Sequence, residues 1–129
     1  MLAIDTNIIV RYLTGDHPRQ SVQAKTLIDT HEVFVCTTVF LETEWVLRSA
    51  YGFSAPKLAQ GLRAFAGHPN VTLEDPAITA QALEWMEHGL DFADALHLAK
   101  SQDCEAFISF DRNFAKAANK LAIIKTRAP

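Results

Sequence analysis

The feature that most constrains the fold of this chain is an alternation of short apolar runs with longer segments of helical spacing. The runs are three or four residues long and each contains a β-branched residue: 2–4, 33–36, 71–73, 106–109 and 122–124. Such runs are typical of buried strands. Because one or two helices separate consecutive strands, right-handed crossovers should give a parallel sheet covered on both faces. We therefore predict an α/β fold with about five short parallel strands in three α/β/α layers.

The segments between the runs carry residues that begin and end helices. Three prolines stand at expected helix starts and three glycines at expected ends: Pro18, Pro56, Pro76, Gly52, Gly67 and Gly89. Apolar residues within these segments recur three or four positions apart, as in Leu58, Leu62 and Phe65. Two further helices are predicted over 91–102 and 112–119.

The length of the chain fits a single domain. Its 129 residues are 49% hydrophobic and include no low-complexity tract, so the chain can bury a core of its own. We expect one domain over residues 1–129, without a long linker.

Nothing in the sequence suggests a membrane or a disulfide framework. No apolar run approaches the roughly 20 residues that a membrane-spanning helix needs, and no basic and apolar leader opens the chain. Cys36 and Cys104 lie far apart and form no metal-binding pair. We therefore expect a cytoplasmic protein with no membrane association.

Charge is distributed unevenly along the chain. The formal net charge of −3 argues against a protein that wraps nucleic acid by bulk electrostatics. The segment 112–129 nevertheless contains no acid and carries these basic residues: Arg112, Lys116, Lys120, Lys125 and Arg127. The ordinary interpretation is a solvated helix face and tail.

Four acids stand at comparable places in the predicted fold. Asp5 follows the first apolar run and Asp111 follows the fourth. Ligands of open parallel sheets bind beyond the carboxyl ends of the strands, so both are predicted at one edge of the sheet. Glu42 lies about one turn into an apolar helix, and Asp94 lies within another apolar segment.

Each acid taken alone also has a structural explanation. Asp5 and Asp111 can cap helices, and so can Asp91, because a carboxylate is favoured where a helix begins. Glu42 can be a surface residue or can pair with Arg48. These explanations stay open at the level of single residues.

Taken together, the acids Asp5, Glu42, Asp94 and Asp111 predict a metal site. Four carboxylates at one rim repel each other unless a hard cation is present, and all-oxygen ligation favours Mg²⁺ or Mn²⁺ over zinc. Such a cluster supports metal-assisted phosphoryl chemistry. Glu44 is excluded because it lies about 200° around the helix from Glu42.

The order and spacing of four segments resemble those of the PIN-domain ribonucleases, in particular the small VapC-like toxins of toxin–antitoxin pairs. The segments are IDTN at 4–7, FLETEWVL at 40–47, DFADALHLA at 91–99 and FISFDRNF at 107–114. The resemblance extends over essentially the whole chain and implies a single PIN-like domain.

The resemblance also implies roles for the matching residues. It implies that Asp5, Glu42, Asp94 and Asp111 are catalytic acids that bind a divalent ion. Four polar residues are expected to support them: Thr6, Asn7, Ser109 and, as a supporting acid or helix cap, Asp91. The implied reaction is hydrolysis of an RNA phosphodiester, in which water attacks phosphorus and the 3′-oxygen leaves. The implied partners are a second copy of the chain, giving a homodimer, and a small cognate antitoxin.

An acidic site approaches a polyanion with the help of nearby cations. Arg112 and Lys116 follow Asp111 closely and are the main candidates for contact with the RNA backbone. Arg11, about one helical turn beyond Asn7, is a lesser candidate.

Two other functions remain open. A phosphatase that uses Asp5 as a covalent nucleophile would typically carry a second acid two residues later, where this chain has Asn7. A non-catalytic protein-binding module would use the acids only as helix caps. Its stability would not respond to Mg²⁺ or Mn²⁺, whereas an aspartyl phosphate would favour the phosphatase.

Overall fold

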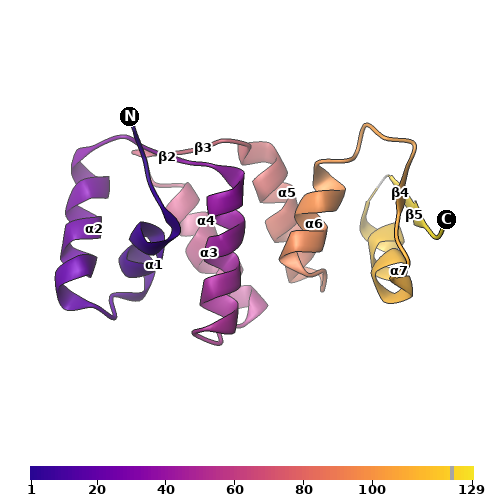
Figure 1. Ribbon diagram of the computed structural model, residues 1–129, viewed down its shortest axis with the longest axis horizontal. Helices are drawn as coiled ribbons and strands as arrows, with labels where there is room; N and C mark the ends of the chain where they lie inside the picture. Colours follow the sequence, from indigo (N-terminus) through magenta and orange to yellow (C-terminus); the bar gives the residue numbers. More distant parts are fainter. Residues whose placement is uncertain (123) are drawn as a thin grey trace. The chain divides into compact units, whose positions relative to one another are not determined.

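The computed structural model describes residues 1–122 and 124–129, and this part of the chain contains five strands and seven helices (Figure 1). Its residues form two compact units, Met1–Pro76 and Ala77–Pro129, which are considered one at a time. The expectation of a single domain over 1–129 remains a prediction.

A parallel sheet lies at the centre of the first unit. Its strands, in the spatial order β1-β2-β3, are β1 (Leu2–Ala3), β2 (Val33–Val35) and β3 (Val71–Leu73). Val33 is the register partner of both Leu2 and Val71. Val33 and Val35 have no exposed surface, so β2 is the buried central strand that its apolar sequence predicts.

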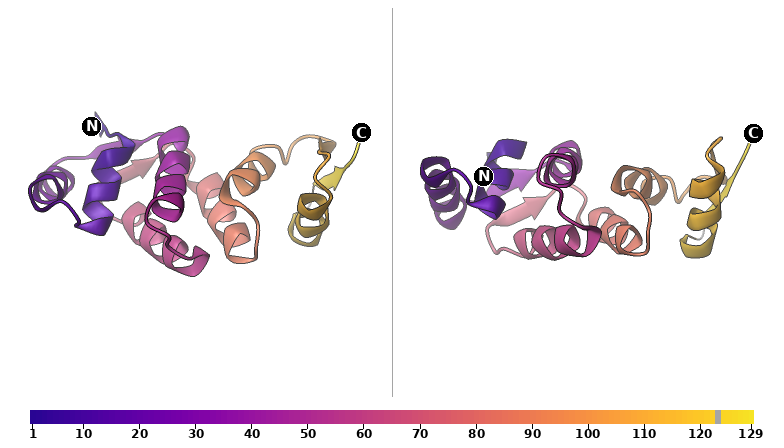
Figure 2. Two further views of the ribbon diagram at one scale, coloured as in Figure 1. Left: turned by 60° about the horizontal axis from the view of Figure 1, so that its bottom comes forward. Right: turned by 90° about the horizontal axis from the view of Figure 1, so that it is seen from below.

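Four helices complete the first unit: α1 (Thr6–Thr14), α2 (Pro18–Thr30), α3 (Thr37–Ser49) and α4 (Ala55–Ala66). α1 packs against α2 and α3, and α4 contacts both α3 and β3. Figure 2 shows the strands of this unit between α1 and α3 on one side and α4 on the other. Ile9, Ile28, Phe40, Leu62 and Phe65 fill the space between these layers and are at most 1% exposed.

Local sequence signals explain where these helices begin and end. Pro18 starts α2 after His17, whose Nδ1 accepts a hydrogen bond from the N–H of Gln20 at 3.1 Å. Gly15 ends α1 with a φ of 63°, a left-handed conformation that glycine adopts without a Cβ clash.

The second unit contains three helices and two strands. They are α5 (Pro76–Glu87, which begins one residue before the unit), α6 (Phe92–Ala99), β4 (Ala106–Ile108), α7 (Arg112–Leu121) and β5 (Lys125–Arg127). β4 and β5 pair in parallel, with Ile108 opposite Arg127. α7 packs on this pair, and the Phe107 and Phe114 rings meet edge to face at 5.6 Å.

The α/β class, the short parallel strands and the layered arrangement are confirmed. Hydrogen bonds group the strands into a three-stranded and a two-stranded sheet. The strand predicted over 122–124 includes residue 123, which lies outside the described residues, and the described strand is Lys125–Arg127. In the described parts of the chain, no helix has both the length and the apolar character needed to cross a membrane.

Candidate active site

The first acid lies where β1 gives way to α1. The ladder continues to Ile4, whose N–H donates to the carbonyl of Phe34 at 3.0 Å. Asp5 follows in extended conformation, and its Oδ1 accepts a hydrogen bond from the N–H of Thr6 at 2.8 Å. Asp5 is therefore the N-cap of α1, and its side chain is exposed at the positive end of the helix.

Thr6 joins the start of α1 to the second acid. Its side chain is buried, and its hydroxyl donates a hydrogen bond to Oε1 of Glu42 on α3. Glu42 itself is exposed. This hydrogen bond joins Thr6, the residue after Asp5, to Glu42, which lies 36 positions further along the chain.

Glu44 points elsewhere, as its helical phase predicts. It is only 1% exposed, and Oε2 accepts a hydrogen bond from Nε of Arg48 at 3.0 Å. This ion pair belongs to Glu44, so the alternative pairing of Glu42 with Arg48 is not seen. A half-exposed arginine stabilises a buried carboxylate here, and Glu44 takes no part in the site.

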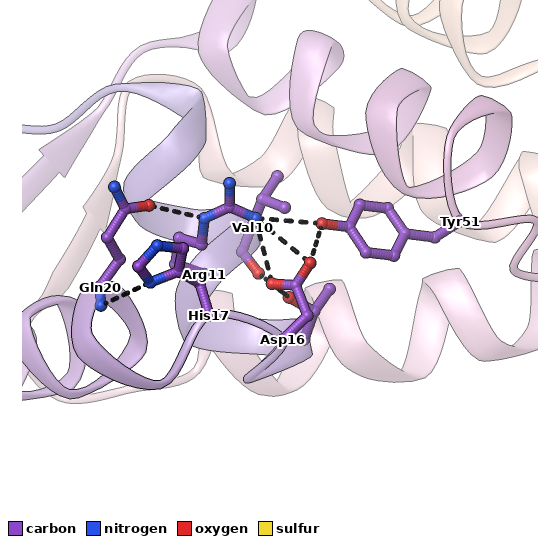
Figure 3. Close-up of polar contacts among 7 residues, drawn as sticks. Val10, Arg11, Asp16, His17, Gln20 and Tyr51 are labelled. Carbon is purple, nitrogen blue, oxygen red and sulfur yellow. Dashed lines mark hydrogen bonds and ion pairs between the residues drawn. The ribbon is translucent and has the colours of Figure 1, made fainter.

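Asn7 and Arg11 lie on the side of α1 that faces α2. Both line a cavity of about 440 Å³ between these helices, together with Gln20 and Leu27. Arg11 is held by several partners there: Nε donates to Gln20 Oε1 at 2.8 Å, and Nη1 contacts Asp16 Oδ1 at 3.1 Å (Figure 3). Its charge is therefore largely neutralised inside the chain.

Asp16 is the centre of this polar cluster (Figure 3). It accepts hydrogen bonds from the hydroxyls of Tyr51 at 2.6 Å and Thr14 at 2.7 Å. The Tyr51 and Thr14 hydrogen bonds, followed by the charge of Arg11, lower the pKa of Asp16 to about 2. Tyr51 lies 35 residues from Asp16, so no local sequence pattern could have revealed this contact.

The second unit holds the third acid. Asp91 is the N-cap of α6, and its Oδ1 accepts a hydrogen bond from the N–H of Asp94 at 3.1 Å. Partial burial raises the pKa of Asp94, and the negative charges of Asp91 and Asp111 raise it further, while His97 opposes the shift. Asp94 thus carries its charge among other carboxylates, where a cation would be favourable.

The fourth acid, Asp111, follows β4 and caps α7. Its Oδ1 accepts a hydrogen bond from the N–H of Phe114 at 2.9 Å, and its own N–H donates to the hydroxyl of Ser109 at 3.1 Å. Ser109 therefore fixes the turn that presents Asp111. Arg112 and Lys116 follow on α7 and are both exposed.

The donor chemistry of these four acids suits a hard divalent cation. In the described part of the chain, Lys or Arg side chains pair with Asp16, Asp29 and Glu44. Among the same described residues, no such ion pair involves any of the four predicted ligands: Asp5, Glu42, Asp94 and Asp111. Exposed carboxylate oxygens without an internal cation are the donors that Mg²⁺ and Mn²⁺ prefer.

Two predicted ligands belong to each unit, Asp5 and Glu42 to the first and Asp94 and Asp111 to the second. Within the described residues, no group of three or more His, Cys, Asp or Glu side chains is arranged to hold a metal ion. The four-acid metal centre therefore remains a prediction.

The model of the PIN domain family matches residues 2–120. The chain belongs to the PIN domain family. PIN domains are typically nucleases and generally use divalent metal ions, so the family supports a hydrolase of nucleic acids. Comparison of this PIN domain with curated proteins gave no match.

Proposed function

We propose that this PIN domain is a Mg²⁺-dependent endoribonuclease, for which Mn²⁺ can substitute. The observation that carries the proposal is that four acids in the segments that resemble the PIN-domain ribonucleases form no ion pair with Lys or Arg in the described residues: Asp5, Glu42, Asp94 and Asp111. In a PIN domain these are the carboxylates that match the metal ligands, and unneutralised carboxylates favour a bound cation.

The supporting residues hold these acids in place. Thr6, the residue after Asp5, donates a hydrogen bond to the carboxylate of Glu42, and the Ser109 hydroxyl accepts one from the backbone N–H of Asp111. Asp91 accepts a hydrogen bond from the N–H of Asp94 and so orders the first turn of α6. Rotamers fixed in this way reduce the reorganisation that ligand binding would otherwise require.

The proposed reaction needs no covalent enzyme intermediate. A divalent ion held by Asp5, Glu42, Asp94 and Asp111 would make a water molecule usable as a nucleophile near neutral pH and would offset the charge that develops on the phosphate. One of the four carboxylates accepts the proton of the attacking water, and the 3′-oxygen leaves. Asn7 stands where a phosphatase would need a second acid, which disfavours a covalent role for Asp5.

The RNA backbone is proposed to approach the second unit at α7. Arg112 and Lys116 are exposed there, one helical turn apart, so they can contact neighbouring phosphates. Arg11 is a weaker candidate than the sequence suggested, because Asp16 and Gln20 already occupy its guanidinium.

We further propose that the chain acts as the toxin of a toxin–antitoxin pair, as a homodimer, and that a small antitoxin inhibits it. This rests on the resemblance of its four segments to VapC-like toxins. Expression of the wild-type chain alone should arrest bacterial growth, and co-expression with the antitoxin encoded beside it should restore growth. Growth arrest that is unchanged in Asp5→Asn would contradict a nuclease toxin.

The experiment that tests the activity compares bacteria expressing the wild type and Asp5→Asn by sequencing newly formed RNA 5′ ends. The wild type should create discrete new ends that Asp5→Asn does not, because the variant loses a carboxylate while Asn can still cap α1. Asp103→Asn is the matched control, since Asp103 is an exposed acid outside the four segments.

Cleavage assays with purified protein provide a second test of the proposed activity. Wild type and Asp103→Asn should cleave the identified RNA with Mg²⁺ or Mn²⁺, and EDTA should abolish cleavage. The proposal is wrong if cleavage persists in EDTA or in Asp94→Asn. A chain that binds a partner protein but neither cleaves RNA nor responds to divalent ions would instead be a non-catalytic binding module.

A further inference from the structure

Phe110 is the most exposed large apolar side chain in the described part of the chain, with 87% of its surface accessible. It is also the residue immediately before Asp111. An aromatic ring left in water gains no burial energy from the fold, so neither the core nor helix capping explains its presence here.

The backbone on either side of Phe110 is firmly held. The N–H of Ser109 donates to the carbonyl of Arg127 at 3.0 Å, which ties this segment to β5. The N–H of Asp111 donates to the Ser109 hydroxyl at 3.1 Å, and Asp111 caps α7 through Phe114. The exposed ring therefore projects from a fixed turn, which lowers the entropy cost of using it as a contact.

Side-chain alternation explains why the ring is not in the core. Phe107 faces α7 and packs against Phe114. The next residue, Ile108, points to the other face and is 47% exposed. Phe110 lies two positions further on, beyond the end of β4, and is exposed as well.

Cations flank this aromatic ring. Arg127 is the register partner of Ile108, and Arg112 lies two residues beyond Phe110; both are exposed. Proteins that bind single-stranded nucleic acids combine exposed aromatic rings, on which bases stack, with cations that contact the backbone. A partner protein that buried only Phe110 and half-exposed Ile108 would desolvate little apolar area next to fixed charges.

We propose that Phe110 is a stacking platform for one unpaired base of the RNA substrate, with Arg112 and Arg127 contacting the flanking phosphates. This inference rests on the proposed ribonuclease function and assigns it a residue that determines specificity. Because Phe110 adjoins Asp111, the stacked base would lie close to the scissile phosphate. Duplex RNA, whose bases are already stacked, gains nothing from this contact.

The test measures binding of a short fluorescein-labelled single-stranded RNA of mixed sequence by anisotropy, in an Asp94→Asn background that prevents cleavage. Phe110→Ala should raise Kd about tenfold, or about 1.4 kcal/mol, because one stacked base is lost. Phe110→Trp should keep Kd within about twofold, whereas Phe110→Leu should resemble Ala. Val22→Ala, which trims another exposed apolar side chain, should leave Kd unchanged.

Two further readouts separate stacking from a structural effect. RNA carrying 2-aminopurine should lose fluorescence on binding wild-type Phe110 protein at one position of the strand, and Phe110→Ala should remove that quenching. Duplex RNA of the same sequence should bind both proteins equally. Thermal melts should be the same for all the Phe110 variants, because the ring makes no core contact.

The outcomes distinguish this inference from the function on which it rests. If the wild type cleaves RNA but Phe110→Ala binds single strands as tightly, the stacking role is wrong and the nuclease stands. If the wild type neither binds nor cleaves RNA, both are wrong. If Phe110→Ala changes only the oligomeric state measured by light scattering, the ring is a protein contact and the inference is wrong.

Discussion

Acidic side chains of this PIN domain fall into two groups according to how their charge is balanced. Arg11 and Lys25 neutralise Asp16 and Asp29 on the surface, and Arg48 neutralises the buried Glu44. Asp94, by contrast, has its pKa raised by partial burial and by the charges of Asp91 and Asp111, with His97 opposing the shift. An acid kept in such surroundings reduces the stability of the metal-free chain, which is the usual compromise at a functional site.

Replacing Asp94 should therefore separate activity from stability. Asp94→Asn removes a half-buried charge that Asp91 and Asp111 repel, so its Tm in EDTA should exceed that of the wild type by a few degrees. The same change should abolish RNA cleavage. Differential scanning calorimetry in EDTA checks the first effect, with Asp103→Asn as the control. A lower Tm for Asp94→Asn would show that the carboxylate stabilises the fold instead.

Asp16 makes the stability of the folded chain depend on pH, because its pKa is lowered on folding. Its pKa is lowered from 3.8 to about 2 in the folded chain, so the stability it contributes is present above pH 3.8 and is lost as the pH falls towards 2. Tyr51→Phe removes the largest cause of that shift and should raise the pKa of Asp16. Carboxyl NMR titration measures this pKa directly. An unchanged titration in Tyr51→Phe would contradict the assigned hydrogen bond.

At the scale of elements, two of the four proposed ligands are also helix caps. Asp5 caps α1 and Asp111 caps α7. The two explanations that the sequence left open are thus compatible, because a carboxylate can cap a helix with one oxygen and offer the other to a ligand. Substitutions that keep the helix cap but remove the carboxylate can separate the role in capping from the role in ligand binding.

Asp111→Asn and Asp111→Ala form such a pair. Asn remains a good N-cap, so Asp111→Asn should unfold at nearly the wild-type denaturant concentration, while Ala should cost about 1 kcal/mol of unfolding free energy. Both should lose cleavage activity, since neither has a carboxylate. Urea titrations and RNA cleavage assays test the pair. Activity retained in Asp111→Asn would reduce Asp111 to a cap.

The elements predicted from local signals were found close to their expected places. Proline starts and short β-branched runs located β2, β3 and α2 because those signals act within a few residues. The strand expected at 122–124 includes residue 123, which lies outside the described residues, and the last described strand is Lys125–Arg127. There Thr126 is held by Asn119 of α7, with its N–H donating to Asn119 Oδ1 at 2.8 Å.

Side-chain contacts can likewise be divided into those that local sequence predicts and those that it does not. The helical phase that excluded Glu44 follows from geometry within one helix, and Glu44 is buried, whereas Glu42 is exposed. The Thr6–Glu42 hydrogen bond and the Tyr51–Asp16 contact join residues 36 and 35 positions apart. Pairing at that separation depends on how helices pack, which composition and spacing do not specify.

For the whole molecule, the proposed function links metal binding to folding. A ligand that binds only the folded chain stabilises it by RT ln(1 + [L]/Kd), about 2.7 kcal/mol when the ligand is at 100 times Kd. Mg²⁺ or Mn²⁺ at millimolar concentration should therefore raise the Tm of the wild type. The Tm should be lowest in buffer that contains EDTA and no divalent ion. A non-catalytic module would show no such rise.

Two variants test the link between metal binding and stability, and each replaces one acid in a different unit. Glu42→Gln belongs to the first unit and Asp94→Asn to the second, and each should abolish the rise in Tm with Mg²⁺ if both carboxylates are ligands. Glu44→Gln is a poor control because Glu44 is buried with Arg48, so Asp103→Asn is used instead and should keep the full response. Calorimetric titration with Mg²⁺ provides an independent measure of binding. If Glu42→Gln alone retains the response, the ligands are confined to the second unit, and the role of Glu42 would have to be assigned to RNA or to Thr6.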